Sequence, residues 1–330
     1  MGAAPEVSFI VSFKNGENMT AECMRTLFAC AAEIPSAEYI FVDDGSTERT
    51  GALPDLLTYL SKTFGIRYEL SRYSASVGFT LATSEAARRA NGTYLLFLNN
   101  DAFIQRNALR ALRETFLVHA NVGVVGGKLI NRDDVTGEAR TQEAGAIVWK
   151  DASGAWFLKN SQLHAGKSNE VNHRLGYLRE TDYVSAAFAM VPRKLFLQYN
   201  MFDVHFSPGY YEDTDLSFTM RANGHRVLYQ PFAHVLHNAH STYKGDTESL
   251  IERNRQHFVS KCALQHPLLI AQSPLATHRS PVSPIRRKVG RQASSAYAAV
   301  HRRLRMQSAA EDHVHASGSD AHVLVPHALD

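Results

Sequence analysis

The chain has 330 residues, of which 45% are hydrophobic and 20% are charged, values that are ordinary for a globular protein with a normal core. The formal net charge of +3 is small, so no nucleic-acid partner is expected. The three cysteines, Cys23, Cys30 and Cys262, are odd in number and lack metal-site spacing, which favours free thiols in a reducing compartment.

Short apolar runs alternate with helical patterns in the early part of the chain. Strands are predicted at Val7–Phe13, Ala37–Ser46, Ile66–Arg72 and Tyr94–Leu98. Helices are predicted at Glu17–Glu33 and Thr80–Asn91. This alternation predicts an α/β fold with a mostly parallel central sheet and helices on both faces. Ligands bind beyond the carboxyl ends of the strands in such sheets.

The later part of the chain is less regular. Residues 131–180 carry scattered Gly, Asn and Asp, and two dense segments follow at 182–196 and 206–242. Near Gln265 the composition shifts toward Ser, Pro, Ala, His and Arg. We therefore predict one domain at residues 1–265 and a basic, partly disordered extension at residues 266–330.

The N-terminus carries no recognisable targeting signal. No basic segment precedes an apolar stretch, and Glu6 stands where a myristoylation site needs Ser or Thr. No apolar run approaches the length needed to cross a bilayer. The sequence thus predicts a soluble cytoplasmic protein.

Two carboxylates, Asp43 and Asp44, end the second predicted strand, and Gly45 and Ser46 follow them. An acid exposed at such a turn can accept hydrogen bonds from a nucleotide base or from ribose hydroxyls. A plain strand-to-helix turn capped by Ser46 explains these residues equally well when they are taken alone.

The strand that begins at Tyr94 ends in the polar triplet Asn99, Asn100 and Asp101. A carboxylate in this place can bind a hard divalent cation, which would offset the charge of a diphosphate leaving group. Taken alone, the triplet is more simply interpreted as a surface turn that caps the following helix.

Three acids, Glu212, Asp213 and Asp215, stand at the start of a helical pattern. Acids there are stabilised by the helix dipole, and one of them can equally serve as a general base at the mouth of a pocket.

A histidine cluster follows. His237 lies in a run that also contains His234 and His240. Imidazole is a common metal ligand, but chemistry alone does not choose among the three, and a lone histidine near a strand end is usually structural.

The order of these features resembles glycosyltransferase family 2, the nucleotide-sugar-dependent enzymes with the GT-A fold. The resemblance covers about Val7 to Ala263 and rests on five separated motifs, which are VSFIVSFKN, FVDDGSTERT, VGFTLATSEAARRANGTYLLFLNND, DYVSAAFAMVPRKLF with FSPGYYEDTDLSFTMRANGHRVLYQP, and HVLHNAHST. The segments QEAGAIVW and YYEDTDL are most similar to bacterial polysaccharide and O-antigen transferases.

The resemblance implies a donor site. Asp44, with Asp43 beside it, would contact the nucleotide of a nucleoside-diphosphate sugar, and Asn100 belongs to the same predicted site. Asp101 and His237 would bind a divalent metal, Mg or Mn, that bridges the diphosphate.

The resemblance also implies the chemistry. Asp213 would be the general base, and Glu212 would position the acceptor or support Asp213. The enzyme would invert the anomeric centre and pass a sugar to a hydroxyl of a glycan or lipid-linked acceptor in polysaccharide biosynthesis. The chain departs from the usual family pattern at Ser12, Lys14, Ser76, Ser84, Asn99 and Ala186.

Two other classes of function stay open at this point. One is a non-catalytic glycan- or partner-binding module on a transferase scaffold. The other is a nucleotidyltransferase, which would favour a Gly-rich, basic loop after the first strand. FKNGENMT has one Gly and one Lys, so this second alternative is weak.

Residues 284–306 are basic, and a helix there would place apolar residues on one face with arginines beside it. Such a helix can lie on an anionic membrane surface, where lipid-linked acceptors are found. The apolar face is weak, so a solvated helix or a packing arm is an alternative interpretation.

Overall fold

The computed structural model describes residues 4–34, 36–48, 50–132, 139–150, 156–160, 175–238 and 246–265. The predicted extension at residues 266–330, with its basic helix at 284–306, lies outside the described residues, and so does His240. The domain boundary at Gln265 therefore stays a prediction.

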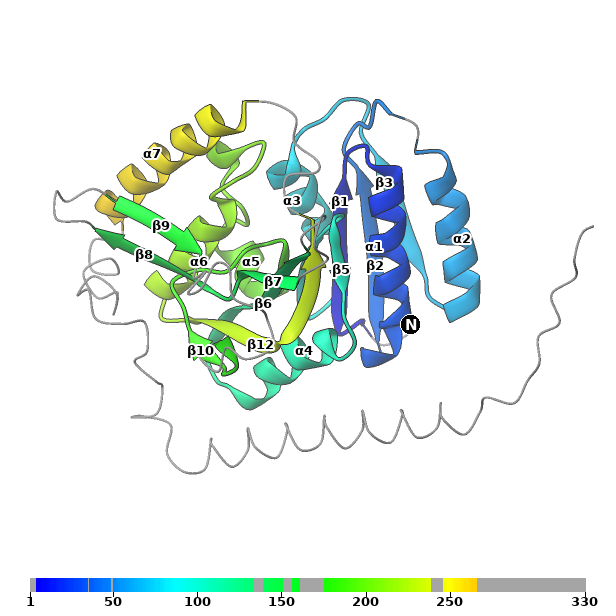
Figure 1. Cartoon of the computed structure of the whole chain (residues 1–330), viewed down its shortest axis with the longest axis horizontal. Helices are drawn as coiled ribbons and strands as arrows, with labels where there is room; N and C mark the ends of the chain where they lie inside the picture. Colours follow the sequence, from blue (N-terminus) through cyan, green and yellow to red (C-terminus); the bar gives the residue numbers. More distant parts are fainter. Residues whose placement is uncertain are drawn as a thin grey trace, which may run out of the picture. The chain divides into compact units, whose positions relative to one another are not determined.

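Four parallel strands form the first part of the sheet in the order β3-β2-β1-β4, and three of them, β1, β2 and β3, are labelled in Figure 1. They are β1 (Val7–Phe13), β2 (Ala37–Asp43), β3 (Tyr68–Arg72) and β4 (Tyr94–Asn99). Buried side chains alternate between the two faces of these strands, as the period of a strand requires. Phe9 and Val11 enter one hydrophobic core, and Ile10 enters the other.

Helices cover both faces of the sheet. One core takes in buried residues of α1 (Glu17–Ala29), α2 (Ala52–Phe64) and α4 (Ala108–Val118). The other takes in buried residues of α3 (Phe79–Arg89), α5 (Arg193–Gln198) and α6 (Glu212–Ala222). The predicted α/β fold with helices on both faces is confirmed.

The first helix is shorter than predicted. Helix α1 ends at Ala29, and a separate 3₁₀ turn, η1, follows at Ala31–Glu33. Cys30 leaves the helical region with φ −92° and ψ 7°, which separates the two. The prediction of one helix over Glu17–Glu33 is wrong in this detail, because the apolar spacing continues through both pieces.

The second part of the sheet mixes strand directions. Strand β11 (Phe188–Pro192) runs antiparallel between β4 and β6 (Val122–Arg132), and β6 pairs in parallel with β12 (Arg226–His237). Three short strands pair antiparallel with these, namely β5 (Ala102–Ile104), β7 (Ala139–Glu143) and β10 (Arg179–Glu180). The segment predicted to be irregular also contains a hairpin, β8 (Ala146–Lys150) and β9 (Trp156–Asn160).

Helix α7 (Thr247–Gln265) follows the sheet. It docks on α6 through Phe258, whose ring lies edge-on to that of Phe218 with 5.1 Å between centroids. Lys261 adds ion pairs of 2.7 Å to Asp203 and 2.8 Å to Asp215. Among the described residues, no helix combines the length and apolarity needed to span a membrane.

Candidate active site

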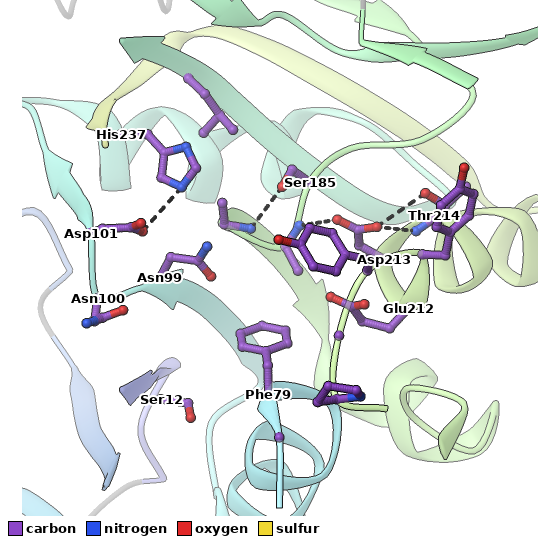
Figure 2. A pocket seen from close by; sticks show the side chains of 18 of the residues that line it. Ser12, Phe79, Asn99, Asn100, Asp101, Ser185, Glu212, Asp213, Thr214 and His237 are labelled. Atoms are coloured by element: carbon purple, nitrogen blue, oxygen red, sulfur yellow. Dashed lines mark hydrogen bonds and ion pairs between the residues drawn. The ribbon is translucent and has the colours of Figure 1, made fainter. Parts of the chain in front are cut away.

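One pocket of about 740 Å³ opens at the carboxyl ends of β1, β2 and β4. It is lined by most of the predicted site residues, which are Asp44, Asn100, Asp101, Glu212, Asp213 and His237. Figure 2 shows these side chains, apart from the unlabelled Asp44, converging from several elements. Asp43 is the predicted site residue that is absent from the described lining.

Strand pairing brings Asp101 to His237. In the antiparallel ladder between β5 and β12, His237 is the partner of Ala102, so Asp101 lies just beyond that pair. Nε2 of His237 lies 3.2 Å from Oδ1 of Asp101 (Figure 2). Both residues are buried, with 7% and 4% of their surface exposed. Two motifs that are distant in sequence thus form one polar pair.

The hydrogen bond of the other ring nitrogen of His237, Nδ1, determines which nitrogen of the neutral ring carries the proton. Nδ1 lies 2.9 Å from Oε1 of Gln142, and a carbonyl oxygen only accepts hydrogen bonds, so Nδ1 carries the proton. In the neutral ring, the lone pair of Nε2 then points at the Asp101 carboxylate, which is repulsive unless a proton or a cation lies between them. A carboxylate oxygen and an imidazole nitrogen arranged in this way fit a divalent cation.

Asp44 holds a neighbouring loop at the pocket. Its Oδ2 accepts hydrogen bonds from Oγ of Ser76 at 2.7 Å and from the Gly78 amide at 3.0 Å. Its Oδ1 accepts one from the Val77 amide at 2.7 Å. The carboxylate therefore fixes the turn before α3 while it lines the pocket wall.

Asp43 has a different environment from its neighbour. Its Oδ1 accepts a hydrogen bond from the Ser46 amide at 2.8 Å, and its Oδ2 lies 3.5 Å from Nε of Arg72. These contacts close the turn after β2. The donor contact predicted for Asp43 stays a prediction.

Asn100 connects the pocket to α1. Its side-chain amide donates a hydrogen bond of 2.9 Å to Oγ1 of Thr20, and both residues are buried. Five of the six departures from the usual family pattern line the pocket, namely Ser12, Lys14, Ser76, Asn99 and Ala186, whereas Ser84 is absent from the described lining. Most of the residues that differ from the family pattern thus lie where a ligand in the pocket would contact them.

Glu212 and Asp213 begin α6 at the pocket, where Glu212 is buried and Asp213 is half-buried. Oδ2 of Asp213 accepts a hydrogen bond from the Ala186 amide at 3.0 Å, and Oδ1 accepts one from the Thr214 amide at 2.6 Å (Figure 2). Burial raises the pKa of Asp213, and burial together with the charge of Asp213 raises the pKa of Glu212. A carboxylate with a raised pKa is a better proton acceptor.

Asp215, the third acid of this group, has another role. Its carboxylate lies 2.8 Å from Nζ of Lys261 on α7, and it is absent from the described pocket lining. It therefore ties α7 to α6.

Glu143 was not predicted as a site residue, yet it lines the pocket at the end of β7. It is 3% exposed, and its Oε1 accepts a hydrogen bond of 2.9 Å from the Ser185 amide. Burial first, and the charge of Asp213 second, raise the pKa of Glu143 to about 8. One signal was available in the sequence, because an acid that directly precedes the apolar run Ala144–Val148 is positioned to be buried.

Two curated relatives match the greater part of the chain. Putative polypeptide N-acetylgalactosaminyltransferase 13 of Drosophila melanogaster is 26% identical over 240 residues, which cover 70% of this chain and 41% of the relative. The O-antigen biosynthesis protein RfbC of Myxococcus xanthus is 24% identical over 245 residues, which cover 73% of this chain and 18% of the relative. The chain thus spans less than half the length of each of these two relatives.

A solved structure supports the fold. The crystal structure of GalNAc-T7 with UDP, GalNAc and Mn²⁺ superposes with a TM-score of 0.57 at 17% identity, covering 78% of this chain and 48% of that one. At that level of identity the likeness establishes the GT-A architecture.

The matching family model is described as glycosyl transferase family 2, and it covers residues 8–196, more than half of the chain. The match includes the strand ends that carry Asp44 and Asp101, whereas Asp213 and His237 lie beyond it. The chain belongs to glycosyltransferase family 2.

Proposed function

We propose that this protein transfers a sugar from a nucleoside-diphosphate sugar to a hydroxyl of a glycan or lipid-linked acceptor, with inversion, in polysaccharide biosynthesis. The observation that carries the proposal is the convergence of Asp44, Asp101, Asp213 and His237 on one pocket. Family membership and the O-antigen biosynthesis relative support the same direction.

Asp213 is the general base of this proposal. It takes the proton of the acceptor hydroxyl, whose oxygen then attacks the anomeric carbon while the bond from that carbon to the diphosphate oxygen breaks. Its raised pKa and its hydrogen bond from the Ala186 amide support this role, because they give a basic carboxylate with a fixed direction. A single displacement of this kind inverts the anomeric centre.

Glu212 assists at the acceptor. Its Oε2 is buried and has no hydrogen-bond partner among the described residues. A buried carboxyl oxygen without a partner is costly, and an acceptor hydroxyl that donates to it would remove that cost. Glu212 thereby orients the hydroxyl beside Asp213.

Asp101 and His237 are the proposed ligands of a divalent cation, Mg²⁺ or Mn²⁺, and Asn100 belongs to the same donor site. When bound, the cation would offset the negative charge that develops on the diphosphate leaving group. Asp44, with Asp43 beside it, is the proposed contact of the nucleotide. The opposed lone pair and carboxylate, 3.2 Å apart, support the cation site.

The test is isothermal titration of UDP, GDP and dTDP in the presence of Mn²⁺, with and without EDTA. We expect one nucleotide to bind in a metal-dependent way, and Asp101→Ala and His237→Ala each to weaken that binding by about 10-fold or more. Asp55→Ala, a change of an exposed carboxylate on α2, is the matched control.

Two results would contradict the proposal. Absence of metal-dependent binding for all three nucleotides would favour a non-catalytic binding module. Unchanged manganese dependence in either variant would exclude that residue as a ligand. A screen of nucleotide sugars for slow hydrolysis then identifies the donor.

We further propose that the basic segment 284–306 brings the chain to the inner face of a membrane. The support is its sequence, in which Arg286, Arg287, Arg291, Arg302 and Arg303 flank a weak apolar face. Co-sedimentation with vesicles of phosphatidylglycerol tests it. A chain that ends at Gln265 should fail to bind, and equal binding by both chains would contradict the proposal.

A further inference from the structure

The loop that leads into α6 has a strained backbone. We call residues 206–211 the 206–211 loop, and its last two residues, Tyr210 and Tyr211, have φ values of 73° and 74°. Bulky residues in this left-handed region are strained and persist only where surrounding contacts hold them. Pro208 to Tyr211 line the pocket immediately before Glu212 and Asp213.

Asn254 of α7 supplies those contacts. It is 0% exposed, and its side-chain Nδ2 lies within 2.9–3.1 Å of three carbonyl oxygens of the loop, those of Phe206, Gly209 and Tyr210. Its two amide hydrogens are therefore shared among three acceptors. Because this buried amide donates both of its hydrogens to the loop, it stabilises one loop conformation.

Arg253 orients that amide. Its Nε donates a hydrogen bond of 2.9 Å to Oδ1 of Asn254, so the amide nitrogen faces the loop. Its Nη2 donates one of 2.6 Å to the Ser207 carbonyl. Two consecutive residues of α7 thus satisfy four carbonyl groups of the 206–211 loop.

The same side of α7 reaches the pocket. Leu250 and Ile251 line it, and they precede Asn254 by four and three residues, the spacing that places side chains together on a helix. Phe258, four residues after Asn254, packs against Phe218 and lies 5.8 Å from the ring of Tyr211. This side of α7 therefore lines the pocket, anchors the loop and docks on α6 in succession.

We propose that Asn254 is a positioning residue for the acceptor. It holds the 206–211 loop so that a bound hydroxyl is presented to Asp213. Leu250 and Ile251 form the wall of the pocket beside the acceptor. The inference rests on the proposed glycosyl transfer. Asn254 itself contacts none of Asp44, Asp101 and His237, and the loop that it holds meets the turn fixed by Asp44 through Pro208 at Gly78. Donor binding should therefore be less affected than acceptor use.

Asn254→Asp is the sharpest variant, because it keeps the shape and points an oxygen at three carbonyl oxygens. Gln256→Glu makes the same amide-to-acid change on the exposed side of the same helix and is the control. Transfer to a panel of octyl glycosides is compared with hydrolysis of the same donor by water. We expect kcat/KM for transfer to fall about 10-fold or more, mainly through KM, with hydrolysis within about 2-fold of wild type.

Unchanged transfer, or equal loss of transfer and hydrolysis, would overturn the inference. A second readout needs no substrate, so it still applies if the protein transfers no sugar. Amide hydrogens of Ser207 and of residues 209–211 should exchange about 10-fold faster in Asn254→Asp, with those of β1 unchanged. Unchanged loop exchange would also overturn it.

If Asn254→Asp does not fold, Arg253→Ala decides by the same criteria. It removes the bond to Ser207 and the contact that orients Asn254, but leaves Asn254 itself in place. Faster loop exchange with a smaller loss of transfer supports the inference, and wild-type behaviour in both measurements rejects it.

Discussion

Three carboxyl groups lie at one side of the pocket, those of Glu143 and Glu212, which are buried, and that of Asp213, which is half-buried. Their charges influence one another. Like charges in a poorly solvated region oppose ionisation, so these groups keep protons at a pH where exposed carboxyl groups have lost them. A base built in this way accepts a proton readily, and its ionised form depends on its neighbours staying neutral.

The first prediction concerns Asp213. Asp213→Asn keeps the shape and the burial but removes the basic oxygen, so we expect transfer to fall by at least about 10²-fold while nucleotide affinity stays near the wild-type value. Turnover and isothermal titration measure the two quantities separately. Equal losses in both would remove Asp213 from the role of base.

The second prediction concerns pH and stability. The pKa of Glu143 rises from 4.5 to about 8 on folding, so between these values the folded chain holds a proton that the unfolded chain releases. The stability linked to this proton is complete below about pH 4.5 and is lost as the pH rises to about 8.

The change in the free energy of unfolding between about pH 5 and pH 8 should therefore be smaller in Glu143→Gln than in the wild type, by up to a few kcal/mol. Urea unfolding of both proteins at the two ends of this range measures the change. Glu22→Gln, an exposed glutamate on α1, is the control. An unchanged slope in Glu143→Gln would show that Glu143 ionises normally.

At the scale of elements, the strands and helices with the clearest hydrophobic periodicity were the ones that the sequence predicted. Strands β1, β2 and β4 were predictable because their apolar runs end in turn residues, and α3 because of its helical spacing. Helix α7 was not predicted, since the middle of its buried side is Asn254, a polar residue whose partners come from the 206–211 loop. Such burial depends on tertiary contacts that no local pattern contains.

The residues of the candidate site also divide into those that the sequence predicted and those that it did not. Motif order placed Asp44, Asp101, Asp213 and His237 in one pocket, and the structure brings them together. Gln142 and Glu143 were missed, because they lie on β7, whose pairing with β6 has a register shift between Leu129 and Ile130. A shift of this kind decides which side chains face the pocket, and the one available signal in the sequence was the position of Glu143 directly before the apolar run Ala144–Val148.

The third prediction concerns the contact between two loops of the pocket. Gly78 has φ +87°, and a Cβ there would lie 2.5 Å from Cα of Pro208 in the 206–211 loop. Gly78→Ala should lower the free energy of unfolding by about 2 kcal/mol or more, since backbone atoms cannot move aside cheaply. Urea denaturation measures it.

Gly65→Ala is the matched control for this prediction. Gly65 has φ +68° but open space around its Cβ direction, so the change should cost only the positive φ, about 1 kcal/mol. Equal losses in the two variants would mean that Pro208 yields to the new methyl group.

At the scale of the whole molecule, the pocket depends on both parts of the sheet. Asp44 and Asp101 follow the parallel strands β2 and β4, whereas Asp213 and His237 belong to α6 and β12 in the mixed part. The pocket residues thus come from early and late segments of one domain, and neither part alone holds the complete set. The domain at residues 1–265 stays a prediction.

The fourth prediction tests that boundary. A chain that ends at Gln265 should keep the Tm of the full chain within about 2 °C, because the predicted core lies before that residue. It should also keep metal-dependent nucleotide binding. Thermal unfolding followed by circular dichroism measures the first quantity, and a drop of more than about 5 °C would assign residues after Gln265 to the domain.

The pairing of β5 with β12 has a consequence for biosynthesis. A ribosome releases Asp101 early and His237 much later, and the ladder that joins them cannot form before β12 has left the exit tunnel. A nascent chain can therefore assemble the strands that end at the pocket while the two proposed cation ligands are still separated. The proposed cation site can therefore form only late in translation, after most of the described strands have been released.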